Sequence, residues 1–270
     1  MNETLKALRK ARGLTQEQVA EALNLSPQAV GKWERGEALP DIQILPALAA
    51  YFCVSADRLL GIEKTGERSH YDSIYAGEGY YWGAQPSSMC LEVLKYLPPT
   101  RPLKLLDIGC GEGKDAVFFA RCGYVVSAFD FSEEGLKKTR QLAEQARVSL
   151  RAFNANLQSY RLEEEYDILY STGVLEYVKP ELRGEIMGNY KGHVSEGGLV
   201  AFQTFVKKPF INPSRKGKQS DPWKSGELFG YFHDWYFEHC SEYVFDDCHL
   251  GRAPHKHASE RLFARNIQAI

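Results

Sequence analysis

The amino-acid sequence predicts two domains of different fold class, a small all-α domain followed by a larger α/β domain. The first sixty residues carry several short helical patterns, each bounded by glycine or by a capping residue. Most of the remainder alternates apolar, strand-like runs with helical patterns, an order typical of a parallel sheet. A polar stretch that begins near Glu63 separates the two parts. A length of 270 residues is comfortable for two domains.

Composition and charge exclude several classes of protein. Apolar residues make up 44% and charged residues 25% of the chain, which are ordinary values for a globular protein. The net charge of −2 gives no large field that would favour nucleic acid or acidic membranes. We recognise no signal peptide, and no apolar run approaches the roughly 20 residues of a membrane span. The six cysteines form no C-x-x-C pair, so we expect reduced thiols in a cytoplasmic protein.

The first domain is predicted to contain two short helices joined by a tight turn. A first helix ends at Gly13, and Thr15 with Gln18 forms a capping box that opens a second helix. After the turn, Ser26 caps a third helix that has Pro27 at its first position, where a missing N–H has no cost. Such a pair is a helix-turn-helix, whose second helix can enter the major groove of DNA.

The stretch "LTQEQVAEALNLSPQAVGKWERG" is similar to the Cro/phage-repressor-like family of helix-turn-helix domains, and "YFCVSADRLLG" resembles the fifth helix of that family. The resemblance covers residues 3–61. It implies about five helices and binding of double-stranded DNA as a homodimer. It also implies base contacts from Gln28, Ala29 and Lys32 and phosphate contacts from Gln16 and Ser26.

The charge of this domain limits its expected affinity for DNA. Its seven cations are balanced by seven anions, so we expect modest, strongly salt-dependent attraction to the phosphate backbone. The alternative interpretation is a dimerisation or docking module.

Between the domains, residues 62–86 begin polar and then become rich in aromatic side chains. We predict domains at 1–62 and 75–270, with a linker at 63–74. Tyr75, Tyr80, Tyr81 and Trp82 are too many rings for a tether, and we expect them to cover the second domain.

The stretch "LLDIGCGEGKDAVFFA", residues 105–120, predicts a strand, a glycine-rich turn and a helix. A Walker A loop would need glycine where Ile108 stands and a hydroxyl where Asp115 stands. A dinucleotide-binding G-x-G-x-x-G would need glycine where Lys114 stands. Both phosphate-binding interpretations therefore fail.

The acids beside this turn favour a different ligand. A carboxylate at the end of the strand, Asp107, would repel a pyrophosphate but suits a cationic amino group. Asp130 follows 23 residues later, at the end of the next predicted strand, where an acid can bind ribose hydroxyls. An ammonium and a ribose are both present in S-adenosylmethionine, which we predict as the cofactor.

Residues from about 75 to 267 resemble the class I S-adenosylmethionine-dependent methyltransferases. The resemblance implies a Rossmann-like α/β fold with a seven-stranded, mostly parallel sheet, its last strands at about 196–205, 241–248 and 258–267. Asn156 and Leu157 stand where the family often has Asp-Leu beside adenine. The implied cofactor contacts are Asp107, Gly109, Cys110, Gly111, Gly113, Asp130, Phe131, Asn156, Leu157, Ser171 and Thr172.

Three segments are similar to the tellurite-resistance methyltransferases: "YYWGAQPS", "SGELFGYFHDWYFEHCSEYVFDD" and "PHKHASERLFARN". This resemblance implies a small methyl acceptor, including tellurium and selenium oxyanions. Tyr81 and Trp82 are candidates for the pocket wall, and His255 and His257 for holding an anion. The six cations between Lys207 and Lys224 form either a substrate lid or a solvated loop. We expect no metal, because Cys240, Cys248 and the nearby histidines follow no zinc-site spacing.

Together these features predict a small-molecule methyltransferase fused to a sequence-specific DNA-binding domain. One alternative is a transcription regulator whose second domain senses S-adenosylmethionine without turnover. Another is methylation of nucleic acid, but "STGVLEYV" follows the fourth strand where adenine-N6 enzymes have an Asn/Asp-Pro-Pro-Tyr motif.

Overall fold

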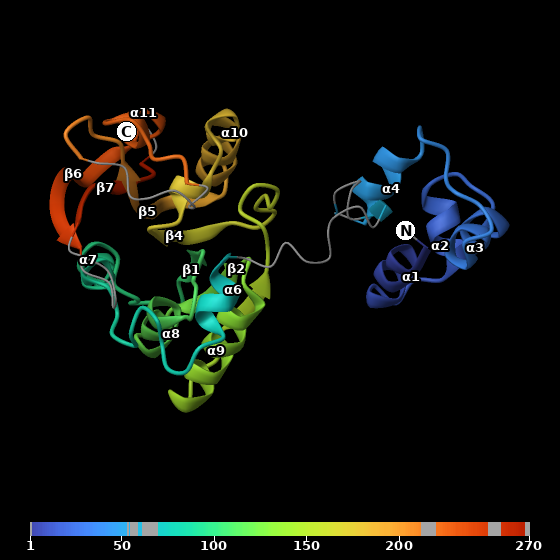
Figure 1. Cartoon of the computed structure of the whole chain (residues 1–270), viewed down its shortest axis with the longest axis horizontal. Coiled ribbons are helices and arrows are strands. Elements are labelled where there is room, and N and C mark those ends of the chain that lie inside the picture. Colours follow the sequence, from blue (N-terminus) through green and yellow to red (C-terminus); the bar gives the residue numbers. More distant parts are fainter. Residues whose placement is uncertain are drawn as a thin grey trace. The chain divides into compact units, whose positions relative to one another are not determined.

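The computed structural model describes residues 2–52, 54, 59–60, 70–211, 220–247 and 255–267. The chain divides into two compact units, Met1–Arg68 and Ser69–Ile270 (Figure 1). No helix within these described ranges is both long and apolar enough to cross a bilayer.

The described part of the first unit is helical: α1 (Asn2–Ala11), α2 (Gln16–Ala22), α3 (Pro27–Arg35) and α4 (Leu45–Tyr51). The predicted caps are confirmed. The Thr15 hydroxyl accepts a hydrogen bond from the Gln18 amide, and the Gln18 side chain accepts one from the Thr15 amide. The Ser26 hydroxyl accepts a bond from the Ala29 amide at the start of α3. Most of the predicted fifth helix lies outside the described residues.

The second unit is built on a seven-stranded sheet, as predicted. Its strands are β1 (Lys104–Ile108), β2 (Val125–Asp130), β3 (Arg151–Asn154), β4 (Tyr166–Thr172), β5 (Val194–Val206), β6 (Tyr236–Asp247) and β7 (His255–Arg265). Their order across the sheet is β3-β2-β1-β4-β5-β7-β6. All neighbours from β3 to β5 are parallel, whereas β7 runs antiparallel to both β5 and β6. β6 and β7 begin at Tyr236 and His255, before the predicted starts at 241 and 258.

Helices cover both faces of this sheet. They are α6 (His70–Tyr75), α7 (Ser88–Tyr96), α8 (Lys114–Arg121), α9 (Glu133–Gln145), the 3₁₀ turn η1 (Leu175–Tyr177), α10 (Pro180–Lys191) and α11 (Glu227–Tyr231). In Figure 1, α7, α8 and α9 lie on one side and α10 and α11 on the other. The central strands are therefore buried on both faces, which explains their near-continuous apolar sequence.

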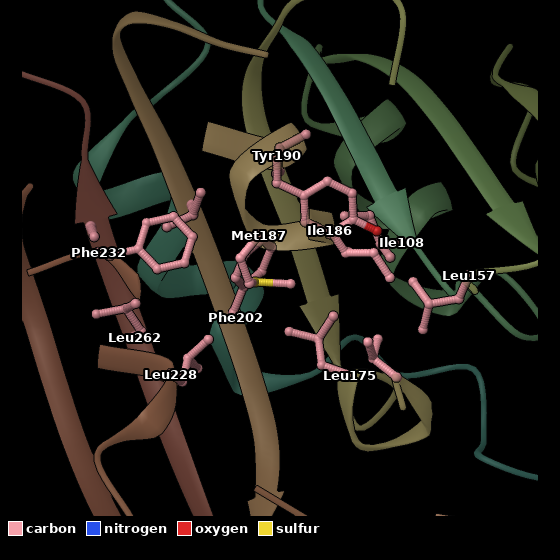
Figure 2. Packing of buried hydrophobic residues seen from close by; sticks show 14 of the residues in the cluster. Ile108, Leu157, Leu175, Ile186, Met187, Tyr190, Phe202, Leu228, Phe232 and Leu262 are labelled. Carbon is pink, nitrogen blue, oxygen red and sulfur yellow. The ribbon is translucent and has the colours of Figure 1, made fainter. Parts of the chain in front are cut away.

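Two apolar clusters fill the space between the sheet and these helices. One joins the sheet to α7 and α8 through Val93 and Phe119. The other joins it to α10 and α11 through residues such as Met187 and Leu228, which pack around Phe202 of β5 (Figure 2). Each cluster is continuous, so both helical layers are fixed to one rigid sheet.

The direction of β7 matters for the site. Because β7 is antiparallel to β5, its first residues lie at the sheet edge where β5 ends, and Ala258 pairs with Val206. The topology thus places His255 and His257 at the edge formed by the carboxyl ends of the parallel strands.

Helix α6 extends into the segment predicted as linker. Residues 70–74 are helical, and the Ser132 hydroxyl at the start of α9 donates to the Asp72 carboxylate. Only six residues long, α6 has too few backbone hydrogen bonds to form alone, so its packing against α9 stabilises it.

Candidate functional site

The glycine-rich turn between β1 and α8 requires glycine for two reasons. Gly109, Gly111 and Gly113 have φ angles of +71°, +53° and +84°, in the left-handed region. A Cβ added to Gly109 would lie 2.4 Å from Cγ1 of Val174, and one added to Gly113 would lie 2.6 Å from the Thr139 side chain. The turn is therefore closely packed from both sides.

Asp107, the acid before this turn, is only 3% exposed. Its Oδ2 is buried and has no hydrogen-bond partner among the described residues. Burial, reinforced by the neighbouring Asp115 carboxylate, raises the pKa of Asp107 well above its ordinary range. A buried carboxylate oxygen without a donor is costly, and a ligand ammonium would supply one.

Asp130, the second acid, lies at the end of β2 and accepts a hydrogen bond from the turn. Its Oδ2 accepts the Gly111 amide at 2.8 Å, and its Oδ1 accepts the Ser132 amide at 2.8 Å. Burial raises the pKa of Asp130. Each carboxylate oxygen can accept more than one bond, so Asp130 can also accept from ribose hydroxyls.

The remaining predicted cofactor residues lie at the same edge of the sheet. Asn156 and Leu157 follow β3, and the Asn156 Oδ1 accepts the Gln158 amide at 2.9 Å. Phe131 follows β2 and is 37% exposed. At the end of β4 the Ser171 hydroxyl donates to the carbonyl of Ile108, and Thr172 pairs with Gln203. Burial raises the pKa of the Cys110 thiol, which argues against a reactive cysteine in the turn.

Asp115 is a functional candidate that the sequence analysis did not select. The buried carboxylate accepts the Ser87 amide and the Lys114 ammonium at Oδ1, both at 2.8 Å, and the Tyr170 hydroxyl at Oδ2, at 2.9 Å. It thereby joins α7, α8 and β4. The sequence does show an acid in the first turn of the helix that follows Gly113, and this position could have marked Asp115 as a candidate.

Aromatic residues from before α7 cover the turn, as expected from the sequence. The Trp82 indole N–H donates to the Tyr75 hydroxyl at 3.0 Å, and that hydroxyl lies 3.0 Å from where a Cβ on Gly111 would stand. The hydroxyls of Tyr71 and Tyr177 are hydrogen-bonded at 2.8 Å, which joins α6 to η1 after β4. Tyr81, 38% exposed, lies edge-on against Trp82.

The two histidines lie in a different part of the same sheet edge. Their rings are 4.7 Å apart between centroids. His257 also stacks on Phe205 at 4.7 Å and lies 5.8 Å from Phe245. They belong to the β5–β7–β6 end, whereas Tyr81 and Trp82 lie beside the glycine turn.

The basic segment after β5 is described only at its ends. Lys208 forms an ion pair with Glu242 of β6, so this cation is already neutralised. Arg215, Lys216 and Lys218 lie outside the described residues, as do Cys248 and His249. Within the described ranges, no three His, Cys, Asp or Glu side chains are grouped as metal ligands.

In the first unit, four of the five predicted DNA-contacting residues line one surface hollow, together with Trp33 and Ala38: Ser26, Gln28, Ala29 and Lys32. The fifth, Gln16, is engaged elsewhere, because its side-chain amide donates to Glu34 Oε2 at 2.7 Å. Its contact with phosphate stays a prediction.

Comparison with known families identifies both units. Residues 80–253 match the family model of the tellurite resistance protein TehB. The chain belongs to the TehB family. Residues 5–59 match a helix-turn-helix family model. The resemblances drawn from the sequence motifs, to a helix-turn-helix domain and to tellurite-resistance methyltransferases, are confirmed.

Individual relatives cover one unit or the other. A probable S-adenosyl-L-methionine-dependent methyltransferase TehB of Haemophilus influenzae is 27% identical over 139 residues, 50% of this chain and 47% of that protein. The HTH-type transcriptional activator BcrR of Enterococcus faecalis is 40% identical over 80 residues, 27% of this chain and 39% of that protein. The chain thus spans about half or less of these relatives.

A solved structure supports the fold. The crystal structure of TehB from Haemophilus influenzae matches with a TM-score of 0.60 at 20% identity, covering 74% of this chain and 66% of that chain. At this level of identity the match concerns architecture, and it agrees with the seven-stranded sheet.

Proposed function

We propose that the chain is an S-adenosylmethionine-dependent methyltransferase. The observation that carries the proposal is the buried, unpartnered oxygen of Asp107 beside a glycine turn, with Asp130 on the neighbouring strand. These two acids fit a ligand with a cationic ammonium and a ribose, and repel one with phosphates. Membership of the TehB family, and the name of the relative from Haemophilus influenzae, support it.

In this mechanism the protein mainly positions the cofactor and the methyl acceptor and excludes water from them. When bound, the cofactor supplies an electrophilic methyl group on a sulfonium. Asp107 would hold the ammonium and Asp130 the ribose. Tyr71, Tyr75 and Trp82 exclude water from the reacting groups, and holding both reactants in line supplies most of the rate enhancement.

We propose a small anionic acceptor, of which a tellurium or selenium oxyanion is the first candidate. The family description and the sequence motifs support this choice. A soft atom attacks through its own lone pair and requires no general base. His255 and His257 would hold the anion at the sheet edge, since an imidazole N–H can donate a hydrogen bond to an oxyanion.

The test is methyl transfer from labelled S-adenosylmethionine to tellurite, selenite and a panel of amines and thiols, with Asp107→Ala as the matched control. Transfer of the labelled methyl group to an oxyanion, absent in the control, is expected. Cofactor binding without transfer to any acceptor would favour the sensing alternative.

For the first unit we propose DNA binding by α3, as a homodimer in the cytoplasm. The hollow lined by Gln28 and Lys32 and the match to helix-turn-helix domains support it. Replacing Lys32 with alanine should weaken binding to a specific DNA duplex by about 1 to 3 kcal/mol and relax the preference for its sequence. Lys10, on α1, provides a control substitution of equal charge.

A further inference from the structure

The ammonium of Lys138, in the middle of α9, donates three hydrogen bonds. It donates to Glu112 Oε1 at 2.8 Å, to the Gly77 carbonyl at 2.9 Å and to the Gly79 carbonyl at 2.5 Å. Its side chain is 15% exposed and that of Glu112 is 2% exposed. An ammonium has three N–H donors, so every one of them has a partner.

Glu112 belongs to the glycine turn itself, between Gly111 and Gly113. Its second oxygen, Oε2, accepts the backbone amide of Trp82 at 3.3 Å. The Lys138–Glu112 pair therefore joins three parts of the site: helix α9, the glycine turn and the loop of residues 77–82. A buried ion pair adds little stability by itself, but its fixed geometry specifies how these parts lie together.

The loop is the second half of one segment that covers the turn. We call residues 70–82 the cap; it comprises α6 and the loop that follows. Beyond the Lys138–Glu112 pair, the cap contacts the site through Tyr75 at Gly111, Asp72 at Ser132 and Tyr71 at Tyr177. The match to the TehB family begins at residue 80, so α6 precedes it.

We propose that Lys138 and Glu112 are positioning residues that hold the cap over the glycine turn and so set how long the cofactor stays bound. The inference rests on the proposed cofactor site, because the turn is argued to contact the cofactor. Losing the pair frees the loop carbonyls and the Trp82 amide, and a displaced cap admits water to the pocket. The dissociation rate of the cofactor then rises, while the acids that bind it are unchanged.

The first experiment compares the full-length chain with Lys138→Met, which keeps an unbranched side chain as far as the position of Cε and removes the ammonium. We expect S-adenosylmethionine to dissociate about tenfold faster, the scale of one lost charge-assisted hydrogen bond. The KM for the cofactor is expected to rise more than kcat falls. Lys137→Met is the matched control, because Lys137 directly precedes Lys138 in α9 and its exposed ion pair with the Glu134 side chain lies within that helix.

The second experiment, hydrogen exchange without cofactor, separates this inference from the proposed function. Amides of residues 77–82 are expected to exchange faster in Lys138→Met and in Glu112→Gln, while those of the sheet keep their protection. Equal exchange in variant and parent chain would overturn the positioning role, as would unchanged or slower cofactor dissociation. Failure of the parent chain to bind cofactor, with the exchange effect present, would overturn the proposed function alone.

Discussion

Asp107 illustrates how one side chain can make cofactor affinity depend on pH. Its raised pKa means that, in the free protein, the carboxyl still carries a proton at pH values where an exposed aspartate has lost it. A bound ammonium favours the carboxylate, so binding releases that proton. We therefore expect affinity for S-adenosylmethionine to rise with pH up to the raised pKa of Asp107, by as much as about tenfold per pH unit, and to level off above it.

This pH dependence is measured by calorimetric titration in buffers of different ionisation enthalpy, which also counts the released proton. Asp107→Asn provides the control, since it keeps the shape and cannot titrate. An equally steep pH dependence in that variant would contradict the assignment.

Gly109 is a single residue whose replacement is expected to lower the stability of the fold. Alanine there would strain the backbone and place its Cβ 2.4 Å from Val174, a branched side chain with little freedom to move. We expect Gly109→Ala to lower the free energy of unfolding by about 2 to 4 kcal/mol.

The control for that substitution is Gly184→Ala in α10, where nothing lies within 4 Å of the added Cβ. That change should leave the stability unchanged or raise it by about 0.5 to 1 kcal/mol, since alanine favours a helix. Denaturant unfolding of both variants checks the difference, and similar values would show that Gly109 is not constrained by its surroundings.

The sequence shows which residues carry suitable functional groups for the site, but it does not show which other residues those groups contact. Asp107 and Asp130 stand out because each ends a strand at a fixed distance from the glycines. Lys138 does not, because its three acceptors come from Glu112 and a loop far along the chain. Only the fold brings them together, and a lysine on a helix surface resembles any solvated charge.

Among the elements, α1 and α3 are joined by a buried ion pair to which α2 adds a hydrogen bond. Arg9 donates to both oxygens of Glu34, at 2.6 and 2.8 Å, and Gln16 adds a third bond. The Glu34 side chain is 2% exposed. The bonds from Arg9 lower the pKa of Glu34 below its ordinary value of 4.5, although burial opposes them.

A carboxyl with a lowered pKa stabilises the fold above its unfolded-state pKa, and that stability is lost as the pH falls through the folded-state pKa. Glu34→Gln should therefore destabilise the first unit by about 2 to 4 kcal/mol at neutral pH and reduce its sensitivity to acid. Thermal unfolding of the full chain, followed at neutral pH and below pH 4.5, tests this. Equal acid sensitivity in both chains would contradict it.

Elements with strong local signals were predicted well. The caps at Thr15 and Ser26 follow from side-chain chemistry within each segment, whereas the seven-stranded sheet was implied by the resemblance to class I methyltransferases. Helix α6 was missed because its stability comes from contacts with α9 and η1, which a local pattern does not encode.

At the scale of the whole molecule, each unit has its own apolar core. We therefore expect a fragment of residues 62–270 to fold and bind S-adenosylmethionine with affinity within about threefold of the full chain. A fragment that ends at Gly61 should be helical and bind no cofactor. Circular dichroism and calorimetric titration of both fragments test this, and loss of cofactor binding by the longer fragment would show that the units depend on each other.

The position of β7 between β5 and β6 also determines when the second unit can be completed during synthesis. β5 is synthesised well before residues 255–265, so its edge stays without the strand that joins it to β6 until β7 follows. The helices of the first unit have by then long left the exit tunnel and can already be folded. In that interval the nascent chain exposes an unpaired edge of β5, the kind of surface that chaperones protect from pairing with other chains.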